Sequence, residues 1–264
     1  MVKQFARAFG AEIVTRGTAH YWERQSLIPV LHQIPRHDVT INTVLDVGAA
    51  HGDWSRQCAE VLPDAHYALF EPLEEYRPYL EGARAALRSA EIFSLAIQHE
   101  AGTRTINVHP DLVGSSLYRE NEDSDVNGVE RTVAVDSLDA VCARTSFAPP
   151  FLLKADVQGA EMDVLRGAKE TLSDCAFVIL ETSLFDFYGH GSTVNDTIRI
   201  MTDAGFALYD IFGLSHRPLD GALAQVDLCF VAADGPFRQQ HFFATSEQRR
   251  QLTARLRHHD APAG

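Results

Sequence analysis

The feature that most constrains the fold is the segment Thr43–Trp54, in which a short apolar run ends in an acid and glycines follow. Val44–Val47 has the length and apolar character of a buried strand, and Gly48 and Gly52 permit a tight turn. Apolar positions after Gly52 recur at helical spacing, so the segment predicts a strand, a turn and a helix. In open α/β sheets, ligands approach backbone N–H groups at such turns. We therefore expect the functional site here.

Strand and helix patterns alternate along the chain and predict an α/β fold with a seven-stranded, mostly parallel sheet. Its strands are expected at Val44–Val47, His66–Glu71, Ile92–Ile97, Phe151–Asp156, Ala176–Glu181, Phe206–Ile211 and Val226–Val231. Helices are expected at Asp53–Leu62, Leu73–Arg88, Ser137–Arg144, Glu161–Leu172 and Val194–Ala204, with further β-like pieces at Thr103–Val108 and Arg131–Val135. The stretch between the last two strands is too short for a helical crossover, so we expect the last strand to be antiparallel.

Three regions are expected along the chain. Residues 1–40 have a mainly helical pattern that includes Tyr21 and Trp22, and we expect them to form a helical preface packed on the main domain. Residues 41–246 form that main domain. Residues 247–264 are expected to form a basic C-terminal helix and tail.

The composition indicates which partners the protein can bind and in which cellular compartment it is expected. The formal net charge of −13 counts against nucleic acid or an anionic membrane, because both are bound through Lys and Arg. The four cysteines form no C-x-x-C pair, which favours reduced thiols. Neither a signal peptide nor the ~20 apolar residues of a membrane span are found. We expect a soluble, cytoplasmic protein with a small-molecule partner, and we leave a homodimer open.

The turn Asp46–Gly52 differs from the dinucleotide-binding pattern G-x-G-x-x-G, because Ala50 occupies the place of the second glycine. Glu71 ends the next strand, where a carboxylate can accept both ribose hydroxyls of a nucleoside. Pro72 then takes the chain out of the strand. A phosphate-binding G-x-x-x-x-G-K-[ST] loop is absent. These features predict an adenosine-containing ligand with little or no phosphate.

Lys154 and Asp156 lie near the end of a strand that we expect to be covered on both faces. Charged side chains are rarely buried unless they are paired, and these two point to the same side of a strand. One interpretation is an ion pair that only stabilises the fold. The other is acid/base chemistry, since perturbed charged groups gather at the carboxyl edge of such sheets.

Glu181 ends the following strand, His190 lies in the loop after it, and Asp227 enters from the same edge of the sheet. Asp156, Glu181 and Asp227 could therefore converge. Three carboxyl groups can share protons at raised pKa values or bind a divalent cation, and we favour the interpretation without metal. The candidate catalytic residues are Asp156, Lys154, Glu181 and His190.

Several motifs recur together in a known family. They are Asp46-Val47-Gly48-Ala49 with Gly52, Phe70-Glu71-Pro72, Gly114-Ser115-Ser116-Leu117, Val135-Asp136-Ser137-Leu138, Leu153-Lys154-Ala155-Asp156-Val157-Gln158-Gly159-Ala160-Glu161 and Val164-Leu165-Arg166-Gly167-Ala168. With Glu181, Gly205-Phe206 and Asp227 in the same order, the chain resembles the FkbM family of S-adenosylmethionine-dependent methyltransferases from about Thr43 to Val231.

The resemblance implies a Rossmann-like class I methyltransferase fold, S-adenosyl-L-methionine as the cofactor, and O-methylation of a hydroxyl on a sugar, polyketide or other small secondary metabolite. It implies cofactor contacts at Asp46, Gly48, Ala49, Gly52, Glu71, Pro72, Ser115, Ser116 and Asp156, with the two serines in a lid. The chain departs from the family pattern at Ala50, where Asn is usual, and at Leu95, where a polar residue is frequent.

Two alternative functions remain at this level. A nicotinamide-dependent oxidoreductase shares the glycine turn and the acid that ends the strand, although the pyrophosphate glycine pattern is missing. A non-catalytic protein that binds an adenosine cofactor could use the same fold, because a fold does not by itself determine function.

Overall fold

The structure is a computed structural model that describes residues 26–122, 125–189 and 192–259. Its centre is a seven-stranded sheet with the strand order β3-β2-β1-β7-β8-β10-β9. The strands are β1 (Thr43–Val47), β2 (His66–Phe70), β3 (Ala90–Phe93), β7 (Phe151–Ala155), β8 (Cys175–Ser183), β9 (Phe206–His216) and β10 (Leu223–Ala232). All neighbouring pairs from β3 to β8 are parallel, whereas β10 is antiparallel to both β8 and β9. The expected Rossmann-like methyltransferase fold is confirmed.

The antiparallel strand follows from the length of its connection. Only residues 217–222 separate β9 from β10. This connection is too short to contain the crossover helix that parallel strands need, so the two strands form an antiparallel hairpin. Both strands extend further into the connection than the sequence pattern predicts. The N–H group of Arg217 donates a hydrogen bond of 2.9 Å to the carbonyl oxygen of Ala222 and closes the hairpin.

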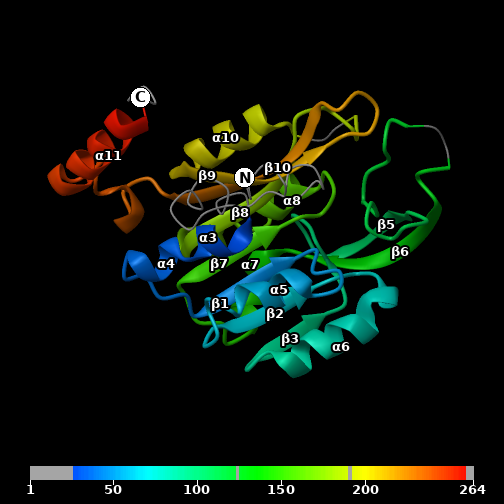
Figure 1. Cartoon of the computed structure of the whole chain (residues 1–264). Helices are drawn as coiled ribbons and strands as arrows, with labels where there is room; N and C mark the ends of the chain where they lie inside the picture. Colours follow the sequence, from blue (N-terminus) through cyan, green and yellow to red (C-terminus); the bar gives the residue numbers. More distant parts are fainter. Residues whose placement is uncertain (1–25, 123–124, 190–191, 260–264) are drawn as a thin grey trace.

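Helices cover both faces of the sheet, as Figure 1 shows. One layer consists of α3 (Leu27–Leu31), α4 (Gln33–Arg36), α5 (Asp53–Cys58) and α6 (Arg77–Ala86), which pack in one hydrophobic core. The other layer consists of α7 (Leu138–Arg144), α8 (Glu161–Arg166), α9 (Lys169–Ser173) and α10 (Val194–Asp203), which pack in a second core. Because each central strand contributes alternate side chains to both cores, its residues are almost continuously apolar.

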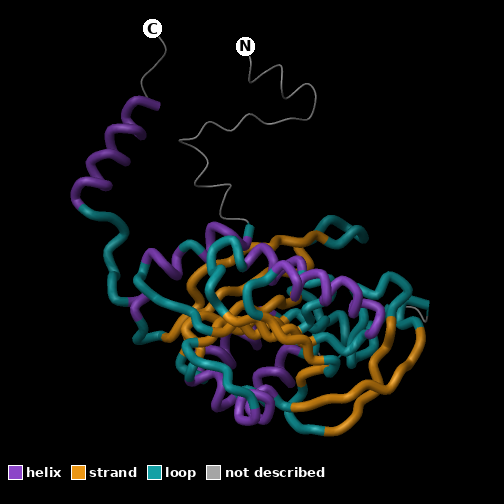
Figure 2. The backbone as a smooth tube through the Cα atoms, turned by 90° about the horizontal axis from the view of Figure 1, so that it is seen from below, coloured by secondary structure: helices purple, strands orange, loops and turns teal. Residues whose placement is uncertain are grey.

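The strand predicted at Ile92–Ile97 is divided between two sheets. β3 ends at Phe93, which pairs with Phe70, the last residue of β2. The chain then enters a second, three-stranded sheet of β4 (Ala96–Ile97), β6 (Val129–Asp136) and β5 (Gly102–Val108), in that spatial order. The two β-like pieces predicted from sequence form the antiparallel pair β5–β6 of this sheet, which extends from one side of the domain (Figures 1 and 2).

The helix predicted at Glu161–Leu172 is interrupted, and α8 ends before Gly167. A side chain at Gly167 would begin 2.1 Å from the carbonyl oxygen of Gln98, so the backbone packs closely against the neighbouring segment there. Asp139 of α7 accepts hydrogen bonds from the backbone N–H groups of Glu170 and Thr171 and so begins α9 as a separate helix. Sequence periodicity does not reveal this tertiary contact.

The helix predicted at Leu73–Arg88 begins with a 3₁₀ turn, η2 (Glu74–Tyr76), and continues as α6 with Pro78 in its first turn. Proline is favoured there because its missing N–H would have no helical partner. The α-helix therefore spans Arg77–Ala86 and is shorter at both ends than the predicted helix.

The two terminal regions differ in their packing. α3 and α4 belong to the predicted preface, and Val30, Leu31 and Ile34 are fully buried in the first core. Tyr21 and Trp22 lie outside the described residues. At the other end a short 3₁₀ turn, η3 (Pro236–Arg238), precedes α11 (Ser246–His259), which extends away from the main body in Figure 2. No helix within the described part of the chain is long and apolar enough to cross a membrane.

We predict opposite effects for two Gly→Ala substitutions. Gly48 has a φ of +76°, and its Cβ would lie 1.9 Å from the carbonyl oxygen of Asp156, so Gly48→Ala should lower the free energy of unfolding by about 2–5 kcal/mol. Gly82 is exposed within α6 and has open space around it, so Gly82→Ala should stabilise the protein by about 0.5–1 kcal/mol. Chemical denaturation measures both; equal stability of Gly48→Ala and the unsubstituted protein would contradict the fold.

Candidate functional site

Strand alternation brings the charged residues to one face of the sheet. Leu152 of β7 and Ile179 of β8 belong to the core beneath α3–α6. Lys154 and Glu181 lie two residues further along these strands, so they face the same side. Asp46 of β1 lies opposite Lys154 in the parallel pairing of β1 and β7. At the carboxyl edge, polar groups therefore take the place of the hydrophobic core.

Lys154 holds the glycine turn against β7. Its Nζ donates a hydrogen bond to the carbonyl oxygen of Gly48 at 2.7 Å and lies 3.3 Å from Asp46 Oδ1 and 3.6 Å from Asp156 Oδ2. The second oxygen of Asp46 accepts a hydrogen bond from the Ser55 hydroxyl at 2.6 Å. Burial alone would lower the pKa of Lys154, but the carboxylates of Asp46 and Asp156 outweigh burial and raise it. Lys154 is therefore a permanent cation behind the turn.

Glu71 is held by backbone groups at the end of β2. Its two oxygens accept hydrogen bonds from Leu73 N–H at 2.9 Å and from Ala50 N–H at 3.1 Å. Burial raises the pKa of Glu71 to about 7, and these two hydrogen bonds oppose the rise because they favour the ionised form. The carboxylate is thus fixed in orientation at the edge of an open pocket.

Asp156 belongs to a group of carboxyl side chains that extends across β8 and β10. Gln158 Nε2 donates to Asp156 Oδ1 at 2.8 Å and to Glu181 Oε2 at 3.0 Å, and Gln225 Nε2 donates to the same Glu181 oxygen at 3.0 Å. Asp227 lies opposite Glu181 in the antiparallel pairing of β8 and β10. Burial, followed by repulsion from neighbouring carboxylates that include Asp156, raises the pKa of Glu181 to about 9 and that of Asp227 to about 7.

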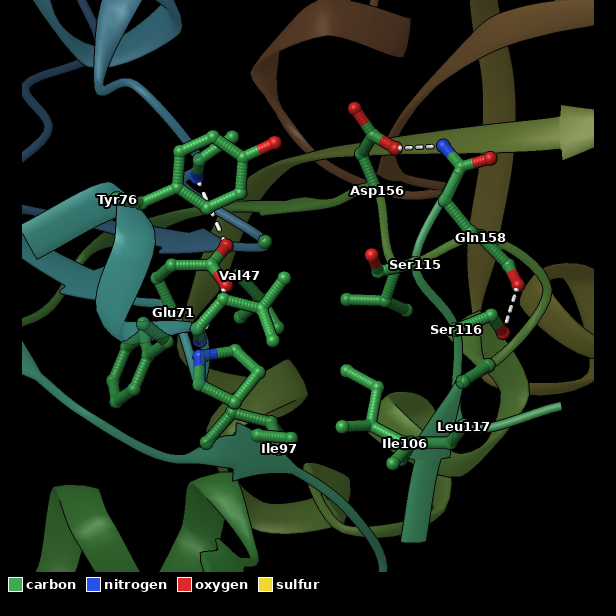
Figure 3. Close-up of a pocket in the computed structure, with 18 of the residues that line it drawn as sticks. Val47, Glu71, Tyr76, Ile97, Ile106, Ser115, Ser116, Leu117, Asp156 and Gln158 are labelled. Atoms are coloured by element: carbon green, nitrogen blue, oxygen red, sulfur yellow. Dashed lines mark hydrogen bonds between the residues drawn. The ribbon is translucent and has the colours of Figure 1, made fainter. Parts of the chain in front are cut away.

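The open pocket lies between the glycine turn and the loop that follows β5. Figure 3 shows Glu71 and Tyr76 across the pocket from Ser115, Ser116 and Leu117. The lining residues are Val47, Gly48, Ala50, Phe70, Glu71, Pro72, Leu73, Tyr76, Leu95, Ala96, Ile97, Ile106, Leu112, Val113, Ser115, Ser116, Leu117, Asp156, Val157, Gln158 and Ala160. This set, taken from the described part of the chain, contains two acidic residues and no Lys or Arg.

The residues predicted from sequence fall into two groups. Those that line the pocket are Gly48, Glu71, Pro72, Ser115, Ser116 and Asp156. Those that lie outside its lining are Asp46, Ala49, Gly52, Lys154 and Glu181. Asp46 and Lys154 are buried behind the turn, and Gly52, with a φ of +73°, packs against Ala83 of α6 and begins α5. His190 lies outside the described residues.

Other pocket residues were not selected from the sequence. Ile97 and Ile106 come from the second sheet, which sequence reasoning did not connect with the turn. Leu117 lies in the loop motif that the resemblance placed at the site, although it was not itself given as a contact. Tyr76 follows Glu71 closely in sequence, but its position carries no motif. Gln158 lies within the predicted motif, and its polar side chain near a strand end was the available signal.

A metal site formed by Asp156, Glu181 and Asp227 finds no support. No group of three or more His, Cys, Asp or Glu side chains among residues 26–122, 125–189 and 192–259 is arranged to hold a metal ion. Hydrogen bonds from amide groups hold Asp156 and Glu181 instead.

Comparison with known sequences gives a consistent result. The family described as "Methyltransferase FkbM domain" matches residues 46–208. The curated protein "2-O-methyltransferase NoeI" of Sinorhizobium fredii (strain NBRC 101917 / NGR234) is 30% identical over 159 residues, which cover 55% of this chain and 65% of that protein. The match therefore spans less than two thirds of the relative's length.

Solved structures with a similar arrangement include two methyltransferases. Magnesium protoporphyrin IX methyltransferase (ChlM) from Synechocystis PCC 6803 with bound SAM has a TM-score of 0.45 and 12% identity, over 86% of this chain and 89% of that chain. N-methyltransferase NodS from Bradyrhizobium japonicum WM9, in complex with S-adenosyl-L-homocysteine, has a TM-score of 0.45 and 10% identity, over 78% of this chain and 87% of that chain.

We predict that Glu181→Gln stabilises the protein increasingly as pH rises. The unfolded chain ionises Glu181 near its ordinary pKa of 4.5, whereas the folded chain keeps the proton up to a pKa of about 9. The folded state therefore binds more protons between these values, and the penalty for Glu181 is absent below about pH 4.5 and complete above about pH 9. The Tm difference between variant and unsubstituted protein should grow from pH 5 to pH 9.

Glu60→Gln, at a solvent-exposed position after α5, is the control for this measurement. The amide oxygen introduced by Glu181→Gln can still accept hydrogen bonds from Gln158 and Gln225, so the variant keeps the local packing. A Tm difference that stays constant or shrinks with rising pH would show that Glu181 does not hold its proton in the folded state.

Proposed function

The chain belongs to the FkbM family of S-adenosylmethionine-dependent methyltransferases, and from this premise we propose that it methylates a hydroxyl oxygen of a small acceptor. The acceptor class that we propose is a sugar, a polyketide or another secondary metabolite. The name of the NoeI relative, a 2-O-methyltransferase, supports transfer to oxygen. The carboxyl groups beside the pocket supply the base that an alcohol acceptor requires.

The observation that carries the proposal is the chemistry of the pocket lining. Two acidic residues, Glu71 and Asp156, line the pocket without any Lys or Arg among the described lining residues. A dinucleotide would bring a pyrophosphate that needs cations or a glycine-rich cradle. A sulfonium nucleoside brings a positive charge instead. The residues therefore suit S-adenosylmethionine and disfavour the nicotinamide alternative.

Different lining residues of the pocket are assigned to different parts of the cofactor. We assign Glu71 to the ribose hydroxyls, because its backbone hydrogen bonds leave each carboxylate oxygen with a further lone pair. The apolar side chains of Leu95, Ile97 and Ile106 offer a surface for the adenine ring. Ser115 and Ser116, on the loop opposite, act as the lid of the site. Gly48 and its neighbours shape the turn that faces the ligand.

When bound, S-adenosylmethionine supplies an electrophilic methyl group with a good leaving group. The protein must then hold the acceptor oxygen in line and take its proton, and a positioned base typically contributes ~10²–10⁴-fold. We assign the base to Asp156, which lines the pocket and lies 3.6 Å from the cationic Nζ of Lys154. Glu181 is a second choice, although its raised pKa keeps it protonated at neutral pH. His190 is the other second choice.

A non-catalytic protein that binds the cofactor is the remaining alternative. It would need neither a pocket-facing carboxylate nor a lysine that holds it. The proximity of Lys154, Asp156 and Glu181 favours an enzyme, because these ionisable groups are buried or partly buried at an energetic cost that cofactor binding alone does not require.

Glu71→Ala should weaken binding of S-adenosylmethionine by about 10–100-fold, because hydrogen bonds to a charged group contribute about 1.5–3 kcal/mol. Isothermal titration calorimetry measures the Kd directly. Glu75→Ala is the matched control, since Glu75 pairs with Arg131 outside the pocket lining and should leave the Kd unchanged. Unchanged affinity of Glu71→Ala would remove Glu71 from the ribose site.

Methyl transfer is tested with methyl-labelled S-adenosylmethionine and a panel of sugars, polyketides and related alcohols, with the product analysed by mass spectrometry and NMR. We expect a methyl ether on a hydroxyl of at least one acceptor. Asp156→Asn should lower turnover on that acceptor by ~100–10,000-fold, because the amide cannot accept the proton, while the Kd for the cofactor changes little.

Asp203→Asn, at an exposed position at the end of α10, is the matched control and should retain full turnover. Turnover of Asp156→Asn equal to that of the unsubstituted protein would assign the base elsewhere. Cofactor binding without transfer to any acceptor of the panel would favour the non-catalytic alternative.

A further inference from the structure

Gln158 occupies the centre of the site in an unusual backbone conformation. Its φ of +53° lies in the left-handed region that non-glycine residues rarely adopt, and Gly159 follows with a φ of +94°. Glu161 holds this turn, because its Oε1 accepts hydrogen bonds from Val157 N–H at 2.9 Å and Gly159 N–H at 3.3 Å. Strained residues of this kind persist where the surroundings determine them, and they cluster at functional sites.

The side-chain amide of Gln158 uses both of its ends. Nε2 donates to Asp156 Oδ1 and to Glu181 Oε2, whereas Oε1 accepts a hydrogen bond from the Tyr188 hydroxyl at 3.1 Å. The opposite orientation of the amide would place its oxygen against two carboxyl groups, so the chemistry of the neighbours determines the orientation. Tyr188 is also packed against Gly159, where a Cβ would lie 2.5 Å from its ring.

The backbone of Gln158 reaches the opposite wall of the pocket. Its carbonyl oxygen accepts a hydrogen bond from the Ser116 hydroxyl at 2.6 Å, as Figure 3 shows. Ser116 belongs to the loop after β5, and Tyr188 belongs to the loop after β8. One residue thus connects both loops with two carboxyl groups.

Asp156 needs such support because its side chain is 36% exposed and could otherwise rotate. Lys154 lies near one of its oxygens and Gln158 donates to the other, so both oxygens are restrained. Small displacements of a reacting group reduce the rate of transfer strongly. The side-chain amide of Gln158 can donate a hydrogen bond to Asp156 without itself accepting the proton of the acceptor hydroxyl.

We propose that Gln158 is a positioning residue for methyl transfer, which orients the Asp156 carboxylate toward the acceptor and makes that orientation depend on the docking of the Ser116 and Tyr188 loops. This inference rests on the proposed function of Asp156 as the base. Tyr188 acts through Gln158 and has no separate part in the chemistry.

The test is a double-mutant cycle with Gln158→Met and Tyr188→Phe. Gln158→Met keeps a side chain of similar length without hydrogen bonds, and it should lower kcat by about 100-fold while the KM for S-adenosylmethionine changes less than about threefold. Tyr188→Phe removes one hydroxyl and should lower kcat by about tenfold. The double variant should be no slower than Gln158→Met alone, because both substitutions remove the same restraint.

Ser173→Ala on α9, outside the pocket lining, is the control and should leave kcat unchanged in each background. Unchanged kcat in Gln158→Met, or full additivity of the two substitutions, would overturn the proposal. Should Gln158→Met fail to fold by circular dichroism, Tyr188→Phe remains decisive, since an unchanged kcat in that variant would equally overturn it.

A second readout needs no acceptor and separates this inference from the proposed function. Carboxyl ¹³C NMR of the free protein follows the titration of Glu181, whose pKa is raised to about 9 by burial and by the nearby carboxyl groups of Asp156, Glu161 and Asp227. Loss of the Gln158 donor in Gln158→Met should raise this pKa further, because the donor favours the ionised form. An unchanged titration would show that the Gln158 Nε2 group, which donates to both Glu181 and Asp156, is not held between these carboxyl groups, and it would overturn the proposal even if no acceptor is methylated.

Discussion

The buried cation of Lys154 is the interaction on which the site depends. A lysine inside a sheet is unfavourable unless carboxylates and carbonyl oxygens surround it, and here Asp46, Asp156 and the Gly48 carbonyl provide them. Removal of one partner from such a buried pair costs about 3–5 kcal/mol, because the remaining charge stays uncompensated. Lys154 therefore connects the first strand and its glycine turn to β7 and to Asp156, which follows it.

Burial has different consequences on the two sides of this cation. On the cofactor side, backbone N–H groups hold Glu71 and partly offset the effect of burial on its pKa. On the other side, Glu181 and Asp227 receive less compensation, and burial together with mutual repulsion favours their protonated forms. One edge of the sheet thus carries the restrained carboxyl group of Glu71 and the carboxylate of Asp156 beside a lysine, both in the pocket lining, and the protonated carboxyl group of Glu181 outside it. These states arise from differences in solvation and hydrogen bonding, since all are the same chemical group.

Strands that carry strong apolar patterns could be predicted well. Val44–Val47 and Phe151–Asp156 are apolar apart from Asp46, Lys154 and Asp156, and a strand buried on both faces requires a mainly apolar run. The division of Ile92–Ile97 between two sheets and the interruption at Gly167 could not be predicted. Both depend on contacts with distant segments, namely the pairing of Phe93 with Phe70 and the approach of Gln98 to Gly167. A local pattern contains no information about which distant backbone group will occupy the adjacent space.

The sequence by itself determined the order of strands and helices, the glycine turn, the acid at the end of the second strand and the family to which the chain belongs. Each of these is a local pattern or a motif. Only the tertiary structure decided that Asp46 lies beside Lys154, that Glu181 lies beside Asp227, and that Gln158 connects Asp156 with both loops. The physical reason is strand register: pairing sets which residues are neighbours, and burial at that edge then sets their protonation. Neither the neighbours of these residues nor their protonation states are defined until the sheet has formed.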